Sequence, residues 1–210
     1  MLKCGGRWAD CPAEYGPSTT AYNRWNRWSR RGVWTRILAA LTGKGLIAET
    51  GQIDSSYIKA HRSAGGAGGA RANAIGISRG GRTTKIHALV DVLRRPLRLV
   101  LTPGNTSDVK GTDMLIGETI GMKRVIADRG YDANRIRATL REQGTIPVIP
   151  GRRNRKRPIQ YDERRYKDRW RVEAMFCRLK DFPRIATRYD KLARNFLSAI
   201  SLAAAVAFWL

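Results

Sequence analysis

The pattern of apolar and polar positions predicts two short helices near the start of the chain. Aromatic residues recur there at every third position, at Tyr22, Trp25 and Trp28. This spacing predicts a helix over residues 18–30, which Ser18 or Thr19 could cap. After a glycine, the apolar residues of 33–41 predict a second helix. We expect this helical region to extend over residues 1–45 and a larger domain to occupy residues 46–210.

The middle of the chain alternates apolar runs with helical patterns. The runs that predict strands are residues 46–64, two strands within 83–108 joined by a turn at 94–96, residues 124–127 and residues 145–150. Helices are expected over 108–120 and 133–143, the second of them capped by Asp132. The glycine-rich residues 65–81 predict a flexible surface connection. This order of elements predicts an α/β fold, with a mixed sheet covered by helices.

Two further helices are predicted near the end of the chain. Residues 166–180 contain no glycine or proline and are rich in helix formers, and Pro183 should end this helix. Residues 192–210 form a mostly apolar helix. Its apolar run is shorter than the roughly 20 residues that a membrane span needs, so we expect it to be buried in the fold.

The charge of the chain indicates a polyanionic partner. The 210 residues include 40 Lys and Arg against 17 Asp and Glu, a net charge of +23. Nucleic acid is favoured over an acidic membrane surface, although charge alone does not separate an enzyme from a packaging protein. Arg24 and Arg27 form a row on the first helix, and residues 152–157 form a basic loop. The first two helices are either part of a helix-turn-helix or a hairpin packed on the main domain, with solvated arginines.

The cysteines point to a reducing compartment. Cys4, Cys11 and Cys177 are odd in number and unevenly spaced, so they suggest neither a disulfide framework nor a zinc site. No signal peptide opens the sequence, and we expect the protein in the cytoplasm.

Three acidic residues stand at places that suggest chemistry. Asp54 lies on the first strand, Asp128 ends the strand over 124–127, and Glu173 lies on the helix over 166–180. Each also has a plain structural interpretation: a capping residue, a turn residue and a surface ion pair, respectively. If the three meet, their repulsion calls for a divalent cation, and oxygen ligands favour Mg²⁺ or Mn²⁺. Such a site suits in-line attack on a phosphodiester.

Glu173 shares its helix face with a phenol and two cations. At about 100° per residue, these side chains fall within a stripe roughly 60° wide. The stripe consists of Tyr166, Arg169, Glu173 and Lys180.

These residues carry a family resemblance. The stripe matches the Y-x2-R-x3-E-x6-K signature in full, and ADRGYDAN and QIDSSYIKAHRSA match the segments around Asp128 and Asp54. The chain resembles DDE-type insertion-sequence transposases, family five in particular, from about Trp8 to Leu210.

The resemblance implies a ribonuclease-H-like fold in which Asp54, Asp128 and Glu173 are catalytic and bind two Mg²⁺ (or Mn²⁺) ions. Such enzymes cut DNA at the element's ends and join the freed 3′-hydroxyls to target DNA, without a covalent protein–DNA intermediate. It also implies a dimer or larger assembly on DNA, at the nucleoid and not at a membrane. The residues expected to contact DNA are Tyr166, Arg169, Lys180, Arg152, Arg153, Arg155, Lys156, Arg157, Arg24 and Arg27.

Two departures from the family pattern shape the alternatives. Family members usually carry a further helical stretch before the position of Trp8, so we expect a shortened DNA-binding front. Pro183 stands where a basic residue is common. The alternatives to an active transposase are therefore a catalytically inactive DNA-binding remnant and a metal-dependent nuclease without strand transfer.

Overall fold

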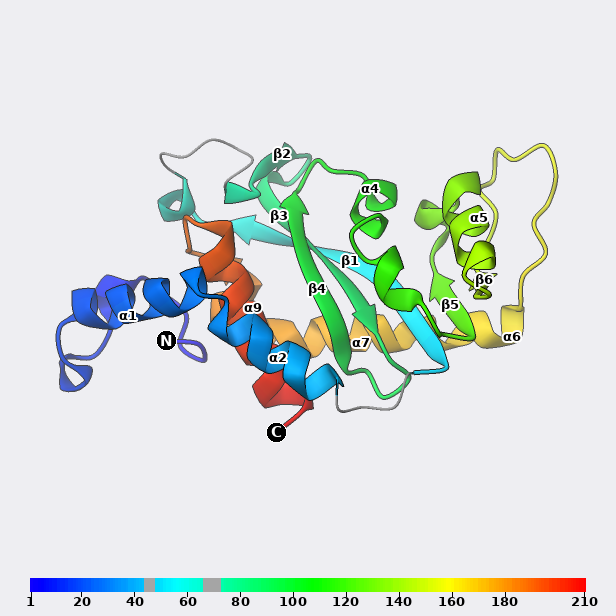
Figure 1. Cartoon of the computed structure of the whole chain (residues 1–210). Helices are drawn as coiled ribbons and strands as arrows, with labels where there is room; N and C mark the ends of the chain where they lie inside the picture. The colour runs from blue at the N-terminus through cyan, green and yellow to red at the C-terminus, as the bar shows by residue number, and fades with distance from the viewer. Residues whose placement is uncertain (44–47, 66–72) are drawn as a thin grey trace.

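Among the residues that the structure describes, seven strands form one mixed sheet around which the fold is organised (Figure 1). The computed structural model describes residues 1–43, 48–65 and 73–210. The strands are β1 (Thr50–Ala60), β2 (Gly76–Ser78), β3 (Gly81–Val90), β4 (Pro96–Pro103), β5 (Arg124–Ala127), β6 (Ile146–Val148) and β7 (Thr187–Arg188). Residues 66–72 of the glycine-rich stretch, and residues 44–47 around the expected domain boundary, lie outside the described residues.

The long strand β1 is the centre of the sheet. It pairs antiparallel with β3 on one side and parallel with β5 on the other. β3 also pairs antiparallel with β4, β5 pairs parallel with β6, and the short β7 runs parallel to the far end of β1. The mixed α/β sheet predicted from the sequence is therefore confirmed.

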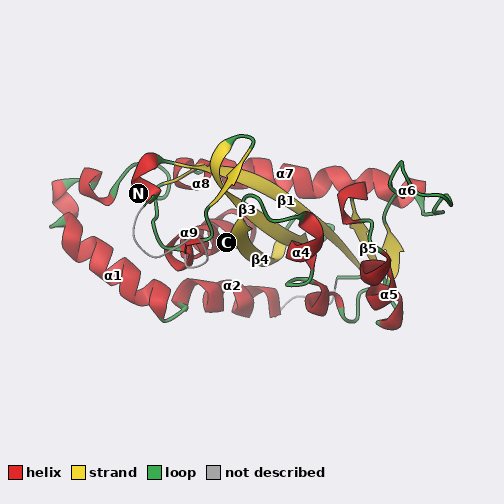
Figure 2. Ribbon diagram, turned by 90° about the horizontal axis from the view of Figure 1, so that it is seen from above, coloured by secondary structure: helices red, strands yellow, loops and turns green. Residues whose placement is uncertain are grey.

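Helices cover both faces of this sheet (Figures 1 and 2). α7 and α9 pack on one face, and α4 and α5 lie on the other. The α-helices are α1 (Ser18–Arg30), α2 (Val33–Gly43), α4 (Asp108–Thr112), α5 (Asn134–Glu142), α6 (Glu163–Tyr166), α7 (Trp170–Lys180), α8 (Pro183–Ala186) and α9 (Ala193–Phe208). Short 3₁₀ turns are η1 (Trp8–Asp10), η2 (Ala13–Tyr15), η3 (Arg62–Ala64), η4 (Ile116–Thr119), η5 (Arg129–Tyr131) and η6 (Lys167–Arg169).

Two apolar cores follow from the alternation of side chains along the strands. Ile86 and Ala88 of β3 point to the face covered by α7 and α9, where Phe176 and Phe196 are buried. Leu89, the next residue of β3, points to the other core with Ile136 of α5. Because successive residues of a strand face opposite sides, one strand supplies both cores.

The helix predictions hold in outline but differ at several ends. The predicted caps are wrong: Pro17 and Ala133 precede α1 and α5, without a side-chain capping bond. Residues 108–120 form the short α4 and the 3₁₀ turn η4 instead of one helix. The expected helix over 166–180 has a 3₁₀ turn, η6, at its start, and Pro183 begins α8, where its missing N–H costs nothing.

The two N-terminal helices pack on α9. Indole rings fill the contact: Trp25 lies 6.0 Å from Trp8 and 5.4 Å from Trp34, measured between ring centroids. The hairpin therefore adds its aromatic residues to the core beside α9. A helix-turn-helix role for these two helices stays a prediction.

The apolar helix α9 is buried, as predicted. Phe196, Ala199, Ile200, Ala203 and Ala204 are fully inaccessible to solvent. Among the described residues, no helix is long and apolar enough to cross a membrane.

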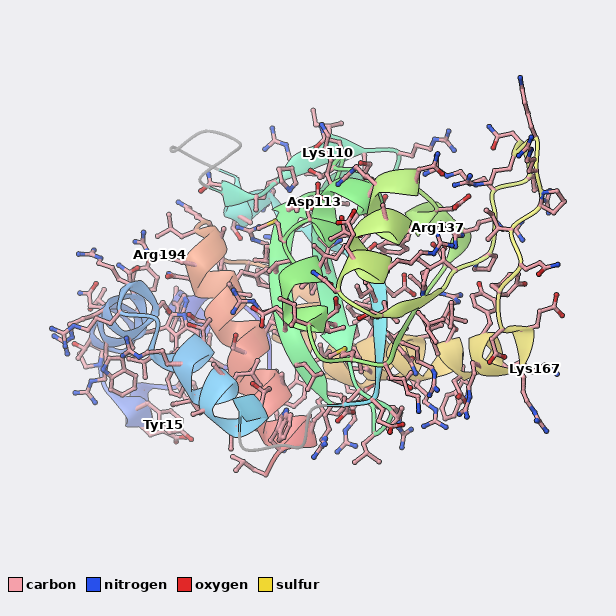
Figure 3. All side chains as sticks on the ribbon, turned by 45° about the vertical axis from the view of Figure 1, so that its right-hand side comes forward. Tyr15, Lys110, Asp113, Arg137, Lys167 and Arg194 are labelled. Atoms are coloured by element: carbon pink, nitrogen blue, oxygen red, sulfur yellow. The ribbon has the colours of Figure 1, made fainter. Side chains whose placement is uncertain are left out.

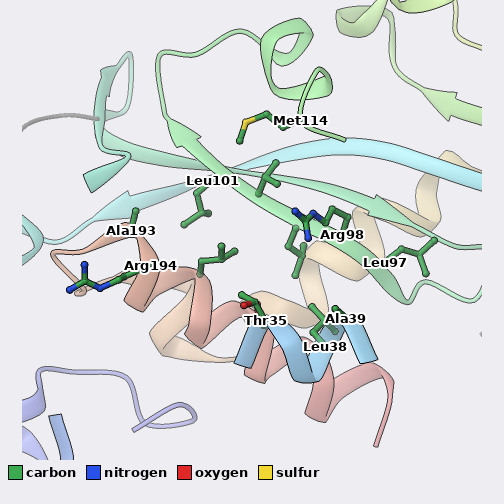
Figure 4. A pocket seen from close by; sticks show the side chains of 13 residues that line it. Thr35, Leu38, Ala39, Leu97, Arg98, Leu101, Met114, Ala193 and Arg194 are labelled. Carbon is green, nitrogen blue, oxygen red and sulfur yellow. The ribbon is translucent and has the colours of Figure 1, made fainter. Parts of the chain in front are cut away.

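An apolar groove of about 400 Å³ lies between α2, α9 and β4 (Figure 4). Leucines such as Leu38 and Leu101 line it, with Arg98 and Arg194 among the lining residues. None of the three acidic residues singled out above lines this groove.

We expect the core around α9 to dominate stability. Phe196→Ala should lower the free energy of unfolding by about 3–5 kcal/mol, because it removes a large, fully buried side chain. Val206→Ala is the matched control on the same helix: Val206 is exposed, so its loss should cost less than about 1 kcal/mol. Denaturant unfolding of the two variants measures both values. Equal costs would contradict the burial of α9.

Candidate active site

The register of β1 and β5 brings Asp54 and Asp128 to the same level. Ile53 pairs with Ala127 across these parallel strands, and each aspartate is the next residue along its strand. Asp128 then closes the turn η5, because its Oδ1 accepts a hydrogen bond of 2.6 Å from the Gly130 amide. Two carboxylates thus stand side by side at the carboxyl end of β5, the end of a sheet where ligands bind in open α/β folds.

α7 brings the third acid to the same side of the sheet. Arg169 lies just before α7 and donates one hydrogen bond to Asp54 Oδ2, at 2.9 Å. Its other terminal nitrogen pairs with Glu173. One guanidinium therefore joins the acid of β1 to the acid of α7.

The surroundings of Asp54 disfavour the ionised form of its carboxyl group. The pKa of Asp54 is raised to about 6. Burial is the largest cause, the Ser55 amide and Arg169 lower the pKa, and the charges of Asp128 and Glu173 raise it. Only 15% of its side chain is exposed. A carboxylate in this setting favours a nearby cation.

The other two residues of the predicted stripe border this acidic group. Lys180, exposed near the end of α7, donates a hydrogen bond of 2.6 Å to Ser56 Oγ, two residues beyond Asp54. Burial raises the pKa of Tyr166, and Arg169 and Asp128 are the charges that act most on it. Tyr166 also contacts Tyr161 edge to face, with ring centroids 5.5 Å apart.

The basic loop divides into inward and outward side chains. Arg155 turns inward and forms an ion pair with Asp132 at 2.5 Å, and Arg152 donates to the Gly130 carbonyl at 3.1 Å. The exposed cations of the loop that lack such an internal bond are Arg153, Lys156 and Arg157. Side chains with nitrogen tips project widely over the molecule (Figure 3).

Asp132 is an internal anchor and not a helix cap. Arg137 and Arg155 both pair with its fully buried carboxylate, and the Arg152 amide donates to it at 2.8 Å. Burial would raise the pKa of Asp132, but the hydrogen bonds from Arg155, Arg152 and Arg137 lower it well below its usual range. The anchor holds the start of the basic loop beside the turn after Asp128.

Arg24 and Arg27 lie far from the acidic group. Both are exposed on α1, which stands at the opposite end of the molecule from α6 in two views (Figures 1 and 2). A DNA contact there would be separate from one at the acids.

Asp108 is the residue near this site that the sequence did not single out. It begins α4 and was expected there only as part of a helix. Its Oδ1 accepts a hydrogen bond of 2.6 Å from Ser55 Oγ, next to Asp54. No local pattern in the sequence indicates this role, because Asp108 comes close to β1 only when the chain folds.

The donor set fits Mg²⁺ or Mn²⁺. Asp54, Asp128 and Glu173 offer oxygen ligands alone, and burial, the main cause of the raised pKa of Asp54, disfavours its unpaired negative charge. Within the described part of the chain, no three His, Cys, Asp or Glu side chains form a ready cluster for a metal ion. Arg169 supplies the positive charge between Asp54 and Glu173 in this arrangement.

Two family models match the sequence. Residues 48–208 match the family described as transposase DDE domain, and residues 1–38 match a putative transposase of the IS4/5 family. A putative transposase for insertion sequence element IS6501 from Brucella ovis is 38% identical over 132 residues, which cover 61% of this chain and 98% of that protein. A putative transposase for insertion sequence element IS402 from Burkholderia cepacia is 31% identical over 137 residues, which cover 60% of this chain and 63% of that protein.

Two solved structures are also similar. The catalytic core domain of BIV integrase is 16% identical, with a TM-score of 0.44, covering 75% of this chain and 82% of that one. A pre-cleavage Mos1 transpososome is 12% identical, with a TM-score of 0.30, and the match covers 83% of this chain and 58% of that one.

The mixed sheet, with β1 antiparallel to β3 and parallel to β5, places the chain in the class of ribonuclease-H-like α/β proteins with acids at a strand end. The chain belongs to the DDE transposase domain family. The resemblance to insertion-sequence transposases is thereby confirmed.

We expect the raised pKa of Asp54 to make stability depend on pH. Because its folded-state pKa of about 6 lies above the ordinary 3.8, the folded protein holds this proton more tightly than the unfolded chain does. That stabilisation is complete below about pH 4 and is lost as the pH rises through about 6. The side chain of Asp54→Asn does not titrate, so this variant does not lose that stabilisation as the pH rises. Relative to the wild type, its free energy of unfolding should therefore rise by about 1–2 kcal/mol between about pH 4.5 and about pH 7.

Denaturant unfolding in the presence of EDTA tests this prediction. Gln160→Asn, an exposed change without a titrating group, is the control and should show a constant difference from the wild type. A constant difference for Asp54→Asn as well would rule out a raised pKa.

Proposed function

We propose that this protein is a DNA transposase that cuts the ends of an insertion sequence and joins the freed 3′-hydroxyls to target DNA. The observation that carries the proposal is that the strand register sets Asp54 and Asp128 on adjacent strands while Arg169 pairs with both Asp54 and Glu173, within a chain of the DDE transposase family. The acids would act as the catalytic set, in a cytoplasmic protein working on DNA at the nucleoid. The domains would be residues 1–45, which contact DNA, and residues 46–210, which catalyse.

Asp54, Asp128 and Glu173 would hold two Mg²⁺ or Mn²⁺ ions. Bound there, the ions would supply Lewis-acid stabilisation of the attacking and leaving oxygens of a phosphodiester. The chain's own contribution would be to keep these carboxylates near one another against their repulsion and to bring cations near the DNA.

The cations beside the acids would bind phosphates of the DNA backbone. Arg169 donates a hydrogen bond to Asp54, and Lys180 donates one to Ser56 on the same strand. Both cations could therefore contact phosphates next to the cut. Tyr166 lies close enough for the charge of Asp128 to raise its pKa, and it would help to position the DNA strand. Arg153, Lys156 and Arg157 would add backbone contacts that do not depend on sequence. Arg152 and Arg155 would serve the loop mainly as internal ties.

We expect Mg²⁺-dependent nicking of DNA that contains the element's ends, and we expect Asp128→Asn to abolish it. The amide removes a charged ligand but keeps the shape of the side chain. DNA binding in EDTA should survive the change, which separates a lost reaction from a lost fold. Asp113→Asn, an exposed acid between α4 and η4, is the matched control and should nick like the wild type. Equal nicking by Asp128→Asn would remove the catalytic assignment.

The same assay separates the alternatives. Wild-type protein that binds the ends but never nicks them would be a DNA-binding protein without catalysis. Nicking without joining of a labelled 3′-hydroxyl to target DNA would define a nuclease. Joined products, formed by a dimer or larger assembly on paired ends, support transposition.

The outward cations of the basic loop should set the salt dependence of DNA binding. Lys156→Gln should reduce the slope of log K against log salt by roughly 0.9, the value for one lost phosphate contact. Arg141→Gln on α5 removes the same charge from an exposed site outside the loop and should leave the slope unchanged. Fluorescence anisotropy over a salt series gives both slopes. Equal slopes for the two variants would show that the loop does not contact phosphate.

A further inference from the structure

A hydrogen-bonded network lies on the sheet face opposite α7, behind Asp54. Ser55 follows Asp54 on β1, so its side chain points to that other face. Its Oγ donates to Asp108 Oδ1 at 2.6 Å, and Lys85 Nζ of β3 donates to the same oxygen at 3.0 Å. None of these three residues has a part in the reaction proposed above.

A buried lysine fixes Asp108 in place. The Lys85 side chain is only 2% exposed, and its ammonium also donates to the Thr106 carbonyl at 2.8 Å and lies 4.5 Å from the centre of the Tyr57 ring. A buried ammonium needs a paired anion, and Asp108 provides it. The pair offsets the negative charge that Asp108 would otherwise add beside the other acids.

The close approach of α4 to the sheet places Asp108 within hydrogen-bonding distance of Ser55 on β1. Gly111 packs directly on the His87 ring of β3, where any larger side chain would collide with the imidazole. The Thr112 hydroxyl donates to the Asp108 carbonyl at 2.9 Å, closing the single turn of α4. The glycine is thus the residue that lets this short helix reach β3.

The second oxygen of Asp108 faces the turn after Asp128. A Cβ atom placed on Gly130 would lie 2.8 Å from Asp128 Oδ1 and 3.7 Å from Asp108 Oδ2. Asp108 Oδ2 therefore lies near Gly130, while its Oδ1 accepts from Ser55. Through this hydrogen bond to β1 and the packing of α4 on the turn η5, Asp108 contacts both segments that carry the two aspartates.

We infer that Asp108 is a positioning residue that holds Asp54 and Asp128 in the relative placement needed to bind divalent cations. It acts through Ser55 on β1 and the turn at Gly130, with Lys85 balancing its charge. Like-charged carboxylates on β1 and just after β5 tend to move apart, and a residue in contact with both segments opposes that movement. This inference rests on the proposed function, because it assigns the tie to the same acidic group.

Binding of Mn²⁺ to the full, metal-free chain tests the inference directly by titration calorimetry. Ser55→Ala and Asp108→Ala should each raise the Kd for Mn²⁺ about 10-fold, the size of effect seen when an outer partner of a metal ligand is lost. The double variant should be no weaker than the poorer single variant, because both changes break one tie. Asp108→Asn keeps an oxygen that can accept from Ser55, so it should retain most of the affinity. Asp113→Asn, an exposed acid five residues further on, should bind like the wild type.

The thermal midpoint and DNA binding in EDTA separate positioning from folding. A lower midpoint with unchanged Mn²⁺ affinity in Ser55→Ala and Asp108→Ala would show a purely structural network and overturn the inference alone. Additive losses in the double variant would overturn it too, since the residues would then act apart. If the wild type binds no Mn²⁺ and never nicks DNA, both the inference and the proposed function fail.

Discussion

The parallel pairing of β1 with β5 is the constraint on which the acidic group depends. Ile53 pairs with Ala127, so Asp54 and Asp128 follow each other at the same level on adjacent strands. Ile53 and Ala127 are both buried in the core beneath α5. A slip of one residue would turn Ile53 out of this core and Asp54 into it, so packing fixes the register and the register places the acids.

The arrangement is electrostatically costly, and the fold offsets that cost with arginine and lysine. Arg169 pairs with Asp54 and Glu173 on the α7 face, and Lys85 pairs with Asp108 on the other face. The pKa of Asp54 stays raised to about 6 even so, because burial outweighs the help of Arg169. An electrostatically unfavourable carboxylate within an otherwise well-packed core is typical of a functional site.

The large positive charge serves two different purposes. Part of it is internal: Arg137 and Arg155 neutralise the buried Asp132, and Arg184 pairs with the buried Asp190. The rest is exposed and available to a polyanion. A count of basic residues therefore overstates the cations that DNA can reach. In the loop over 152–157, two arginines bond inward and three cations remain outward.

The sequence by itself determined much of this protein, because local patterns encode it. Apolar runs predicted β3 and β5, the length of the last apolar run predicted the buried α9, and the three spacings of a four-residue signature predicted the stripe from Tyr166 to Lys180. Asp54, Asp128 and Glu173 were also named from sequence, as candidates that stay predictions. Tertiary structure decided the rest: the inward turn of Arg155, the anchoring by Asp132, the pairing of Arg169 with two acids, and the place of Asp108. These contacts join residues from separate elements, up to 115 positions apart for Arg169 and Asp54, and no local spacing records which elements will meet.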